Sequence, residues 1–346
     1  MRNAAVALCL ALWLSSLPAT AAGYDAQAVN EAQFENGKAS ANKASAAKEP
    51  LLVKAQVLLS RARFSPGEID GKPGANFSKA LSAFAKDRGL QETDRLNEDV
   101  WRKLTDVSAD PPLVEYTITD ADVRGPFATK IPARLEDMKD LPALSYVSPR
   151  ELLAEKFHMS EALLSALNPG KKFDSAGERI VVTNVAQPKL EKVARIEVNK
   201  TEQTLRAFSQ DGKLLAFYPV TAGSSEKPAP SGQLKVTLIK QNPAYRYNPA
   251  YAFKGVRTQK PFTIKPGPNN PVGTAWIGLS GEGYGLHGTP EPSKVSKTES
   301  HGCIRLTNWD AAELALAVTK GIPVDFSGDE QERRMARAQA PRHRRR

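Results

Sequence analysis

Residues 194–223 read ARIEVNKTEQTLRAFSQDGKLLAFYPVTAG, and apolar and polar side chains alternate along most of this stretch. Alternation with a period of two is typical of a strand that buries one face. Asp211 and Gly212 interrupt the alternation, and an Asp-Gly pair is a favoured tight turn between antiparallel strands. The stretch therefore predicts a β-hairpin, and it marks the point where helical patterns give way to strand patterns.

Further strand signals continue to residue 326. They are GQLKVTLIKQNP (232–243), PFTIKPGPNNPVGTAWIGLS (261–280), YGLHGT (284–289) and IPVDF (322–326). One substantial helix, WDAAELALAVTK, lies among them, with Asn308 as its expected N-cap and Gly321 at its end. Many short strands with one main helix predict a mostly-β domain at residues 193–326, sandwich-like or barrel-like.

The chain of 346 residues is too long for one compact core, and a small α-helical module is expected at residues 51–104. Three helical patterns lie in it: LLVKAQVLLSRARF, SKALSAFAKDRGL and LNEDVWRKL. Gly89 ends the second pattern, and Asn97 is the expected N-cap of the third. The expected core of the module is formed by five apolar side chains: Leu58, Leu81, Phe84, Leu90 and Trp101.

The segment between the helical module and the strand-rich domain has mixed signals. A Pro-Pro pair breaks the chain, and residues 113–146 match no single element pattern. Two helices follow, SPRELLAEKF (148–157) and MSEALLSALNPG (159–170), and then a strand, ERIVVTNV (178–185). The sequence therefore predicts an α+β middle region within residues 113–188.

The N-terminus carries an export signal. Arg2 is followed by the apolar run AAVALCLALWLSSL and then by PATAAG, which offers small residues to a signal peptidase. We therefore expect a cleaved signal peptide at residues 1–22 and an exported protein of the periplasm or cell envelope. The alternative is a short membrane anchor, but the apolar run is too short to span a bilayer comfortably. No later stretch is long enough either, so no transmembrane segment is expected in the mature form.

The composition of two further segments, 23–50 and 327–346, predicts their structure and argues against a nucleic-acid partner. Residues 23–50 are rich in Ala, Lys, Ser, Glu and Asn and predict a linker. Seven arginines fall in residues 327–346, which contribute to the net charge of +10 and predict a disordered basic tail. No aromatic residues lie between these arginines, so a nucleic-acid partner is not expected.

Cys303 is the one cysteine after residue 9, and it lies in the segment TESHGCIRL. His287 and His301 fall within 16 residues of it. A thiol becomes a nucleophile when an imidazole accepts its proton, so this set predicts acyl transfer. The alternatives are a buried structural thiol, an intermolecular disulfide and a zinc site. The polar Ser-His-Gly context disfavours the first, and the ligand spacing matches no familiar zinc pattern.

Residues 284–310, YGLHGTPEPSKVSKTESHGCIRLTNWD, closely resemble the catalytic signature of the L,D-transpeptidases, the YkuD domain family. That signature is an HGT strand end, a loop, and then S/T-H-G-C-x-R/N. GPNNPVGTAWIGL (267–279) also resembles the stretch that precedes the active site in this family. The resemblance covers residues 193–326 and implies a cysteine enzyme that needs neither a metal nor an organic cofactor.

Two further resemblances lie upstream. Residues 51–104 resemble a peptidoglycan-binding-like three-helix module, through the helix of Gln56, the turn at Asp70 and Gly71, and the helices that follow; a generic helical bundle is the alternative. Residues 113–188 partly resemble the second half of a LysM carbohydrate-binding module, because LNPG precedes the strand. Both resemblances imply contact with glycan strands.

The catalytic resemblance implies a role for each residue of the signature. Cys303 would be the nucleophile, and His287 the general base and acid, with its other ring nitrogen oriented by a backbone carbonyl near Gly288. His301 would shape the site and support the thiolate, although spacing alone is compatible with either histidine as the base. The residues implied in binding the substrate or the oxyanion are Gly288, Thr289, Ser300, Gly302 and Arg305.

The implied reaction releases D-Ala from a peptidoglycan stem tetrapeptide while Cys303 forms a thioester. An amine of another stem, or a lysine of an envelope protein, would then resolve the thioester. Two alternatives stay open: an L,D-carboxypeptidase or crosslink hydrolase with the same residues, and a non-catalytic peptidoglycan-binding protein. The complete signature disfavours the second alternative.

Overall fold

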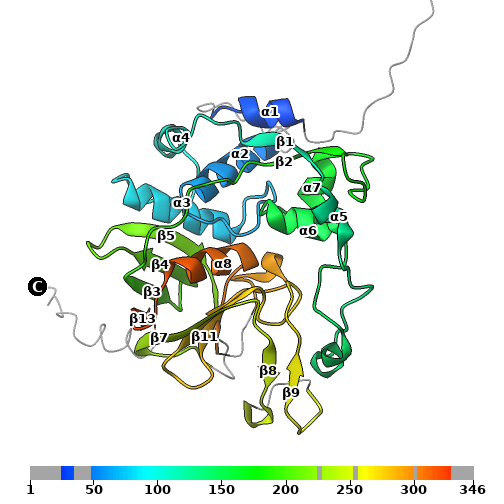
Figure 1. Ribbon diagram of the computed structural model, residues 1–346. Helices are drawn as coiled ribbons and strands as arrows, with labels where there is room; N and C mark the ends of the chain where they lie inside the picture. The colour runs from blue at the N-terminus through cyan, green and yellow to red at the C-terminus, as the bar shows by residue number, and fades with distance from the viewer. Residues whose placement is uncertain (1–24, 35–47, 224–227, 252–255, 299–301, 329–346) are drawn as a thin grey trace, which may run out of the picture.

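The computed structural model describes residues 25–34, 48–223, 228–251, 256–298 and 302–328. The expected signal peptide and most of the expected basic tail lie outside these ranges. Figure 1 shows the α-helices of the N-terminal half on one side of the molecule and the strands of the C-terminal half on the other, with α8 (Asn308–Ala317) between them. No helix in the described ranges is both long enough and apolar enough to cross a membrane.

The C-terminal half is built on one nine-stranded sheet in the order β5-β4-β3-β13-β7-β10-β11-β12-β6. Neighbours are antiparallel except for two parallel pairs, β3–β13 and β11–β12. The strands are β3 (Arg195–Asn199), β4 (Thr204–Phe208), β5 (Leu214–Pro219), β6 (Thr221–Ala222), β7 (Gly232–Gln241), β10 (Ala275–Leu279), β11 (Gly285–His287), β12 (Ile304–Arg305) and β13 (Pro323–Ser327). A separate two-stranded sheet joins β8 (Tyr245–Tyr247) and β9 (Phe262–Ile264). The predicted mostly-β domain with one main helix is confirmed.

The stretch 194–223 folds as its alternation predicts. β4 and β5 pair across Asp211 and Gly212, and Gly212 takes a φ of 83°, which glycine adopts without strain. β3 adds a second antiparallel pair on the other side of β4. Buried residues of β3, β4 and β5 join those of β10, β11 and α8 in one hydrophobic core. The hairpin is therefore one edge of the sheet that carries the catalytic signature.

Helix α8 begins one residue earlier than predicted. Its N-cap is Thr307, whose Oγ1 accepts a hydrogen bond from Asp310 N at 3.2 Å. The predicted cap, Asn308, is wrong because it is already the first helical residue, and its amide points to the middle region instead. The helix ends at Ala317, so Gly321 lies in the turn beyond it, with a φ of 94°.

The three predicted helices of the N-terminal module are confirmed as α2 (Lys48–Arg61), α3 (Ala75–Asp87) and α4 (Glu98–Thr105). Asn97 caps α4, and its Oδ1 accepts a hydrogen bond from Val100 N at 2.9 Å. Gly89 follows the end of α3 with a φ of 69°. Of the predicted core residues, Leu90 is partly buried, and the other four are at most 6% exposed: Leu58, Leu81, Phe84 and Trp101.

The helical module also pairs with the edge of the large sheet. Ser65 N donates to Phe217 O at 2.9 Å, and Phe217 N donates to Arg63 O at 2.8 Å. Phe217 of β5 lies in the hydrophobic core of the module, where its ring stacks on that of Phe64 with centroids 6.3 Å apart. The module and the sheet therefore share buried side chains as well as backbone hydrogen bonds.

The middle region contains six elements. They are β1 (Leu113–Thr117), α5 (Asp120–Arg124), the 3-10 helix η1 (Leu135–Asp140), α6 (Pro149–Lys156), α7 (Glu161–Leu167) and β2 (Arg179–Thr183). The two predicted helices and the predicted strand are confirmed as α6, α7 and β2. The segment 113–146, which matched no pattern, supplies β1, and β1 pairs antiparallel with β2.

Part of the expected linker at residues 23–50 is folded. It contains α1 (Ala26–Glu31), which buries Val29 completely in the core of the middle region. Asn30 bonds to both backbone groups of Leu113: Nδ2 donates to the carbonyl at 3.1 Å, and Oδ1 accepts from the amide at 2.8 Å. The Ala-rich, polar composition conceals this helix because its contact with the core depends mainly on Val29.

Candidate active site

The parallel pair β11–β12 brings the two ends of the catalytic signature together. Its register aligns His287 with Arg305. Cys303 directly precedes β12, so the same register places it beside Gly285. Residues two apart along a strand point to the same face of a sheet. His287 and Arg305 therefore share one face, and Cys303, directly before β12, interacts electrostatically with Arg305. A loop separates the histidine from the cysteine in sequence.

Cys303 is half-buried at the start of β12. Its Sγ lies 3.4 Å from the carbonyl oxygen of Gly283, within hydrogen-bond range for a sulfur donor. Gly302 has a φ of 91°, a left-handed conformation that a side chain would strain. The left-handed backbone conformation before Cys303 therefore requires glycine, and the absence of a side chain lets the main chain lie close to the thiol.

His287 is almost completely buried, with 5% of its surface exposed. Its Nδ1 lies 2.6 Å from the carbonyl oxygen of Gly288. Because a carbonyl only accepts, Nδ1 carries the proton and Nε2 holds the lone pair. The pKa of His287 is lowered to about 3, first by burial and then by the charge of Arg305, while the bond to Gly288 opposes the shift. The imidazole is therefore neutral near physiological pH and offers Nε2 as a base.

The indole of Trp276 lies against the His287 ring. The two residues are opposite each other in the β10–β11 pair, with ring centroids 5.5 Å apart and planes inclined by 18°. Gly285 has no room for a side chain beside them, because its Cβ would lie 2.5 Å from the indole ring. The stack restrains the imidazole. Sequence reasoning missed Trp276; the signal that reveals it is its position in a strand beside the HGT strand.

Of the remaining predicted site residues, the structure describes Arg305 and Thr289. Among the described residues, the buried Nε of Arg305 has no hydrogen-bond partner. Thr289 is 2% exposed, and its Oγ1 accepts a hydrogen bond from Glu291 N at 3.2 Å, which shapes the start of the loop. Ser300 and His301 lie outside the described residues, so their roles stay predictions.

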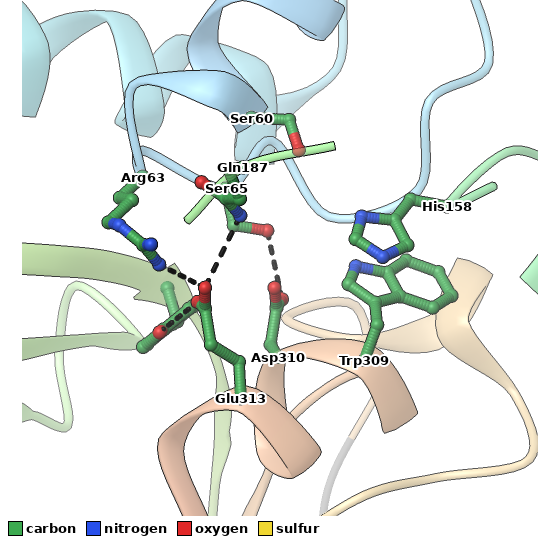
Figure 2. Close-up of a pocket in the computed structure, with 9 residues that line it drawn as sticks. Ser60, Arg63, Ser65, His158, Gln187, Trp309, Asp310 and Glu313 are labelled. Atoms are coloured by element: carbon green, nitrogen blue, oxygen red, sulfur yellow. Dashed lines mark hydrogen bonds and ion pairs between the residues drawn. The ribbon is translucent and has the colours of Figure 1, made fainter. Parts of the chain in front are cut away.

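A separate polar cavity of about 110 Å³ lies between the helical module and α8 (Figure 2). Ser65 Oγ donates to Asp310 Oδ2 at 2.8 Å, and Tyr218 OH donates to Glu313 Oε2 at 2.6 Å. Arg63 forms an ion pair with Glu313. Burial raises the pKa of Asp310 to about 7. These groups bond to one another and none is a predicted site residue, so the cavity is not the predicted active site.

His158 forms part of the wall of this cavity. Its ring stacks on that of Trp309, with centroids 5.0 Å apart and planes inclined by 9° (Figure 2). Burial lowers the pKa of His158 to about 3. Its Nδ1 is buried and has no hydrogen-bond partner among the described residues. Within the described ranges, two histidines therefore stack on tryptophans, His287 on Trp276 and His158 on Trp309.

The sequence model of the YkuD family, the L,D-transpeptidase catalytic domain, matches residues 193–325. The YkuD protein of Bacillus licheniformis, which bears an L,D-transpeptidase name, is 30% identical over 179 residues, 51% of this chain and 92% of that protein. The YqjB protein of Bacillus subtilis, which also bears such a name, is 33% identical over 138 residues, 38% of this chain and 70% of that protein. A crystal structure of L,D-transpeptidase 3 from Mycobacterium tuberculosis with a faropenem-derived adduct has a TM-score of 0.33 and 17% identity, over 44% of this chain and 74% of that one. Because the match spans 92% of the Bacillus licheniformis protein at 30% identity, the chain belongs to the L,D-transpeptidase family.

Proposed function

We propose that this chain is an exported cysteine L,D-transpeptidase that acts on peptidoglycan stem peptides and uses Cys303 as its nucleophile. The observation that carries the proposal is the β11–β12 pairing, which brings the segment of Cys303 next to the strand of His287, together with the bond from Nδ1 of His287 to Gly288. Nε2 is then the lone-pair nitrogen of a neutral imidazole. A neutral imidazole beside a thiol is what general-base activation of a cysteine requires.

In the first half-reaction, Cys303 Sγ attacks the carbonyl carbon that joins the third residue of a stem tetrapeptide to D-Ala. Nε2 of His287 takes the thiol proton as the C–S bond forms, and the backbone N–H groups of Gly302 and Cys303 hold the oxyanion. The imidazolium then protonates the amine of D-Ala, the C–N bond breaks, and a thioester remains on Cys303.

The lowered pKa of His287 has opposite effects on the two proton transfers. An imidazole with a pKa of about 3 is a weak base at rest and a strong acid once it is protonated. The low pKa therefore opposes removal of the thiol proton by Nε2 before the C–S bond forms, and it favours protonation of the leaving amine afterwards. His301 is proposed to support the negative charge that develops on the sulfur during attack.

In the second half-reaction, an amine resolves the thioester. The side-chain amine of the third residue of another stem would give a 3–3 crosslink, and a lysine of an envelope protein would be attached to the wall. Water would instead release a tripeptide, and the enzyme would then be an L,D-carboxypeptidase or crosslink hydrolase with the same residues. Arg305, with its buried Nε as donor, is proposed to bind a stem carboxylate, and Thr289 and Ser300 to shape the loop.

The upstream regions are proposed to contact glycan strands. The support is the resemblance of residues 51–104 to a peptidoglycan-binding-like module and of residues 113–188 to part of a LysM module. Export to the periplasm through a signal peptide at residues 1–22 would bring the enzyme to this substrate. Sedimentation of the purified chain with isolated peptidoglycan sacculi tests the contact, with a chain that begins at residue 193 as the comparison.

The experiment that decides the catalytic proposal incubates the purified chain with stem tetrapeptide and measures the masses of protein and products. A thioester on the protein, released D-Ala and a crosslinked dimer are expected, and Cys303→Ala should form neither adduct nor product. An adduct that persists in Cys303→Ala contradicts the assignment of the nucleophile. Accumulation of tripeptide alone favours the hydrolase, and a wild-type chain that forms no adduct favours the non-catalytic binding protein.

A further inference from the structure

The middle region touches the catalytic domain directly behind His287. Asn308 Nδ2, at the start of α8, donates to both carboxyl oxygens of Glu155 on α6, at 3.1 Å to Oε1 and 3.0 Å to Oε2. The same nitrogen lies 3.1 Å from the carbonyl oxygen of Pro268. Glu155 and Asn308 are 153 positions apart in sequence. The contact therefore joins two distant regions of the chain at the back of the active site.

Asn308 is 1% exposed, and its amide fills the space between two glycines. Its Oδ1 lies so close to Gly273 and Gly288 that a Cβ at either position would overlap it. The same oxygen accepts a hydrogen bond from Thr274 N at 3.1 Å. Both ends of the amide are therefore bonded, and its position against Gly288 is fixed.

Gly288 is the residue that determines the tautomer of His287. Its carbonyl accepts the hydrogen bond from Nδ1 at 2.6 Å, and its own N–H donates to Ala275 O at 3.3 Å. A shift of Gly288 would turn the carbonyl away from Nδ1 and release the ring. Because Asn308 packs against Gly288, its amide restrains the bond that orients the base.

Glu155 fixes the direction of the Asn308 amide. A carboxyl group that accepts from Nδ2 holds the NH₂ end toward α6 and leaves Oδ1 directed at Thr274 and Gly288. Tyr146 OH donates to the same carboxyl group at 2.9 Å and holds it in place. Burial raises the pKa of Glu155 to about 7, and in either protonation state an acceptor oxygen remains for Asn308.

We propose that Asn308 is a positioning residue for His287 and that Glu155 holds Asn308, so that docking of the middle region onto the catalytic domain orients the catalytic base. The inference rests on the proposed role of His287 as the base. It gives the middle region a function in the chemical step, separate from any contact with glycan. Removal of either partner is then expected to slow acylation of Cys303 without any change to a group that touches the substrate.

Three variants of the full chain test the inference: Asn308→Ala, Glu155→Ala and the double variant. Glu151→Ala is the matched control, because Glu151 also lies on α6 and bonds an asparagine of the catalytic domain, Asn269 instead of Asn308, at 2.9 Å. The first readout is the rate of acylation of Cys303 by a carbapenem as a function of pH. The second is the pair of ¹⁵N chemical shifts of the His287 ring, which report its tautomer and are assigned with His287→Gln.

The expected loss in acylation rate is about 10- to 100-fold for Asn308→Ala and about 10-fold for Glu155→Ala, since a misplacement of an ångström costs up to about 100-fold. The double variant should lose no more than Asn308→Ala, because Glu155 acts through Asn308. Glu155→Gln keeps an acceptor and should recover most of the rate, and Glu151→Ala should stay within about twofold. The slow variants should also move the ring nitrogens away from the Nδ1–H tautomer.

The inference is overturned by unchanged His287 shifts with rates within about twofold of wild type, by additive losses in the double variant, or by an equal loss in Glu151→Ala. A wild-type chain that is not acylated defeats the proposed function, and the ¹⁵N shifts still decide whether Asn308 and Glu155 determine the tautomer. If melting curves show that Asn308→Ala does not fold, Glu155→Ala and Glu155→Gln decide the outcome.

Discussion

His287 and His158 are both imidazoles packed against a tryptophan, one in the catalytic domain and one in the middle region. The ring centroids are 5.5 Å apart for His287 and Trp276 and 5.0 Å apart for His158 and Trp309. Burial lowers the pKa of each histidine to about 3. The two imidazoles differ at Nδ1. Nδ1 of His287 donates to Gly288 O, whereas Nδ1 of His158 has no hydrogen-bond partner in the described part of the chain.

Burial, ring stacking and a lowered pKa therefore show that an imidazole is packed inside the fold. They do not by themselves identify a catalytic residue. Burial lowers the pKa of an imidazole whatever its role, and a neighbouring aromatic ring can stack on any packed imidazole. A base needs two further features, a partner that fixes its tautomer and a reactive group beside its other nitrogen. His287 has the first in Gly288, and the proposed reactive group is Cys303, which directly precedes the strand paired with β11. His158 faces the polar cavity instead (Figure 2).

The largest expected effect is the loss of acylation rate when His287, but not His158, is replaced by glutamine. His287→Gln should lower the rate of Cys303 acylation by about 10²- to 10⁴-fold, which is the usual contribution of a general base. His158→Gln should leave that rate within about threefold of wild type. Time-resolved mass spectrometry of the acyl-enzyme measures both rates. Equal losses in the two variants would show that the distinction between the two sites is wrong.

The paired tryptophans give the next largest effect. Trp276→Leu should lower the acylation rate by about 10-fold, because the imidazole loses the ring that restrains it. Trp309→Leu should mainly lower the free energy of unfolding, by about 1–2 kcal/mol, and change the rate little. Urea denaturation and acylation kinetics on both variants separate the two outcomes. A rate loss confined to Trp309→Leu would contradict the roles given to the two stacks.

A smaller effect is expected on the pH dependence of the free energy of unfolding when His158 is replaced, and its sign follows from the lowered pKa of His158. A histidine whose pKa is lower in the folded state stabilises the fold above its unfolded pKa and loses that stability as pH falls toward the folded pKa. For His158 this window runs from 6.5 down to about 3, and one proton gives a slope of at most about 1.4 kcal/mol per pH unit. His158→Gln should therefore flatten the fall in unfolding free energy between about pH 6 and pH 4. Urea titrations at fixed ionic strength measure this slope, and a variant curve parallel to that of the wild type would refute the lowered pKa.

The smallest expected effect is the change in the free energy of unfolding when a serine that lines the polar cavity is replaced. Ser65→Ala removes the hydrogen bond to Asp310, which should lower the free energy of unfolding by about 1 kcal/mol and leave acylation unchanged. Ser60→Ala, on the wall of the same cavity, is the matched control and should change the stability less. Thermal melting of the two variants at neutral pH provides the measurement. A larger loss in Ser60→Ala would show that the bond to Asp310 does not stabilise the interface.

The fold could be predicted where its signals are local. The turn at Asp211 and Gly212 and the cap at Asn97 depend on a few adjacent residues, and both are present. β1 and α1 were not predicted: β1 follows a Pro-Pro pair in a segment of mixed signals, and α1 lies in an Ala-rich, polar stretch. Their contacts also come from far away in sequence, since Asn30 bonds to Leu113 across 83 positions.

The same distinction applies to the site. Cys303 and His287 could be singled out because a lone thiol near two imidazoles is unusual within one short segment. Trp276 and Glu155 could not, because strand register places the first, and a contact across 153 positions places the second. The error at the start of α8 has the same origin: the Asn308 amide is bonded to Glu155, so a neighbouring residue caps the helix.

The pairing of residues 63 and 65 with β5 has a consequence for how copies of the protein meet. β5 is the outermost strand of the sheet, and exposed edge strands recruit strands from other chains and start aggregation. The opposite edge, β6, has only two residues and offers little to recruit. The backbone hydrogen bonds of residues 63 and 65 with Phe217 therefore cover part of the longer edge, which leaves fewer of its backbone groups open to pair with a strand of another chain.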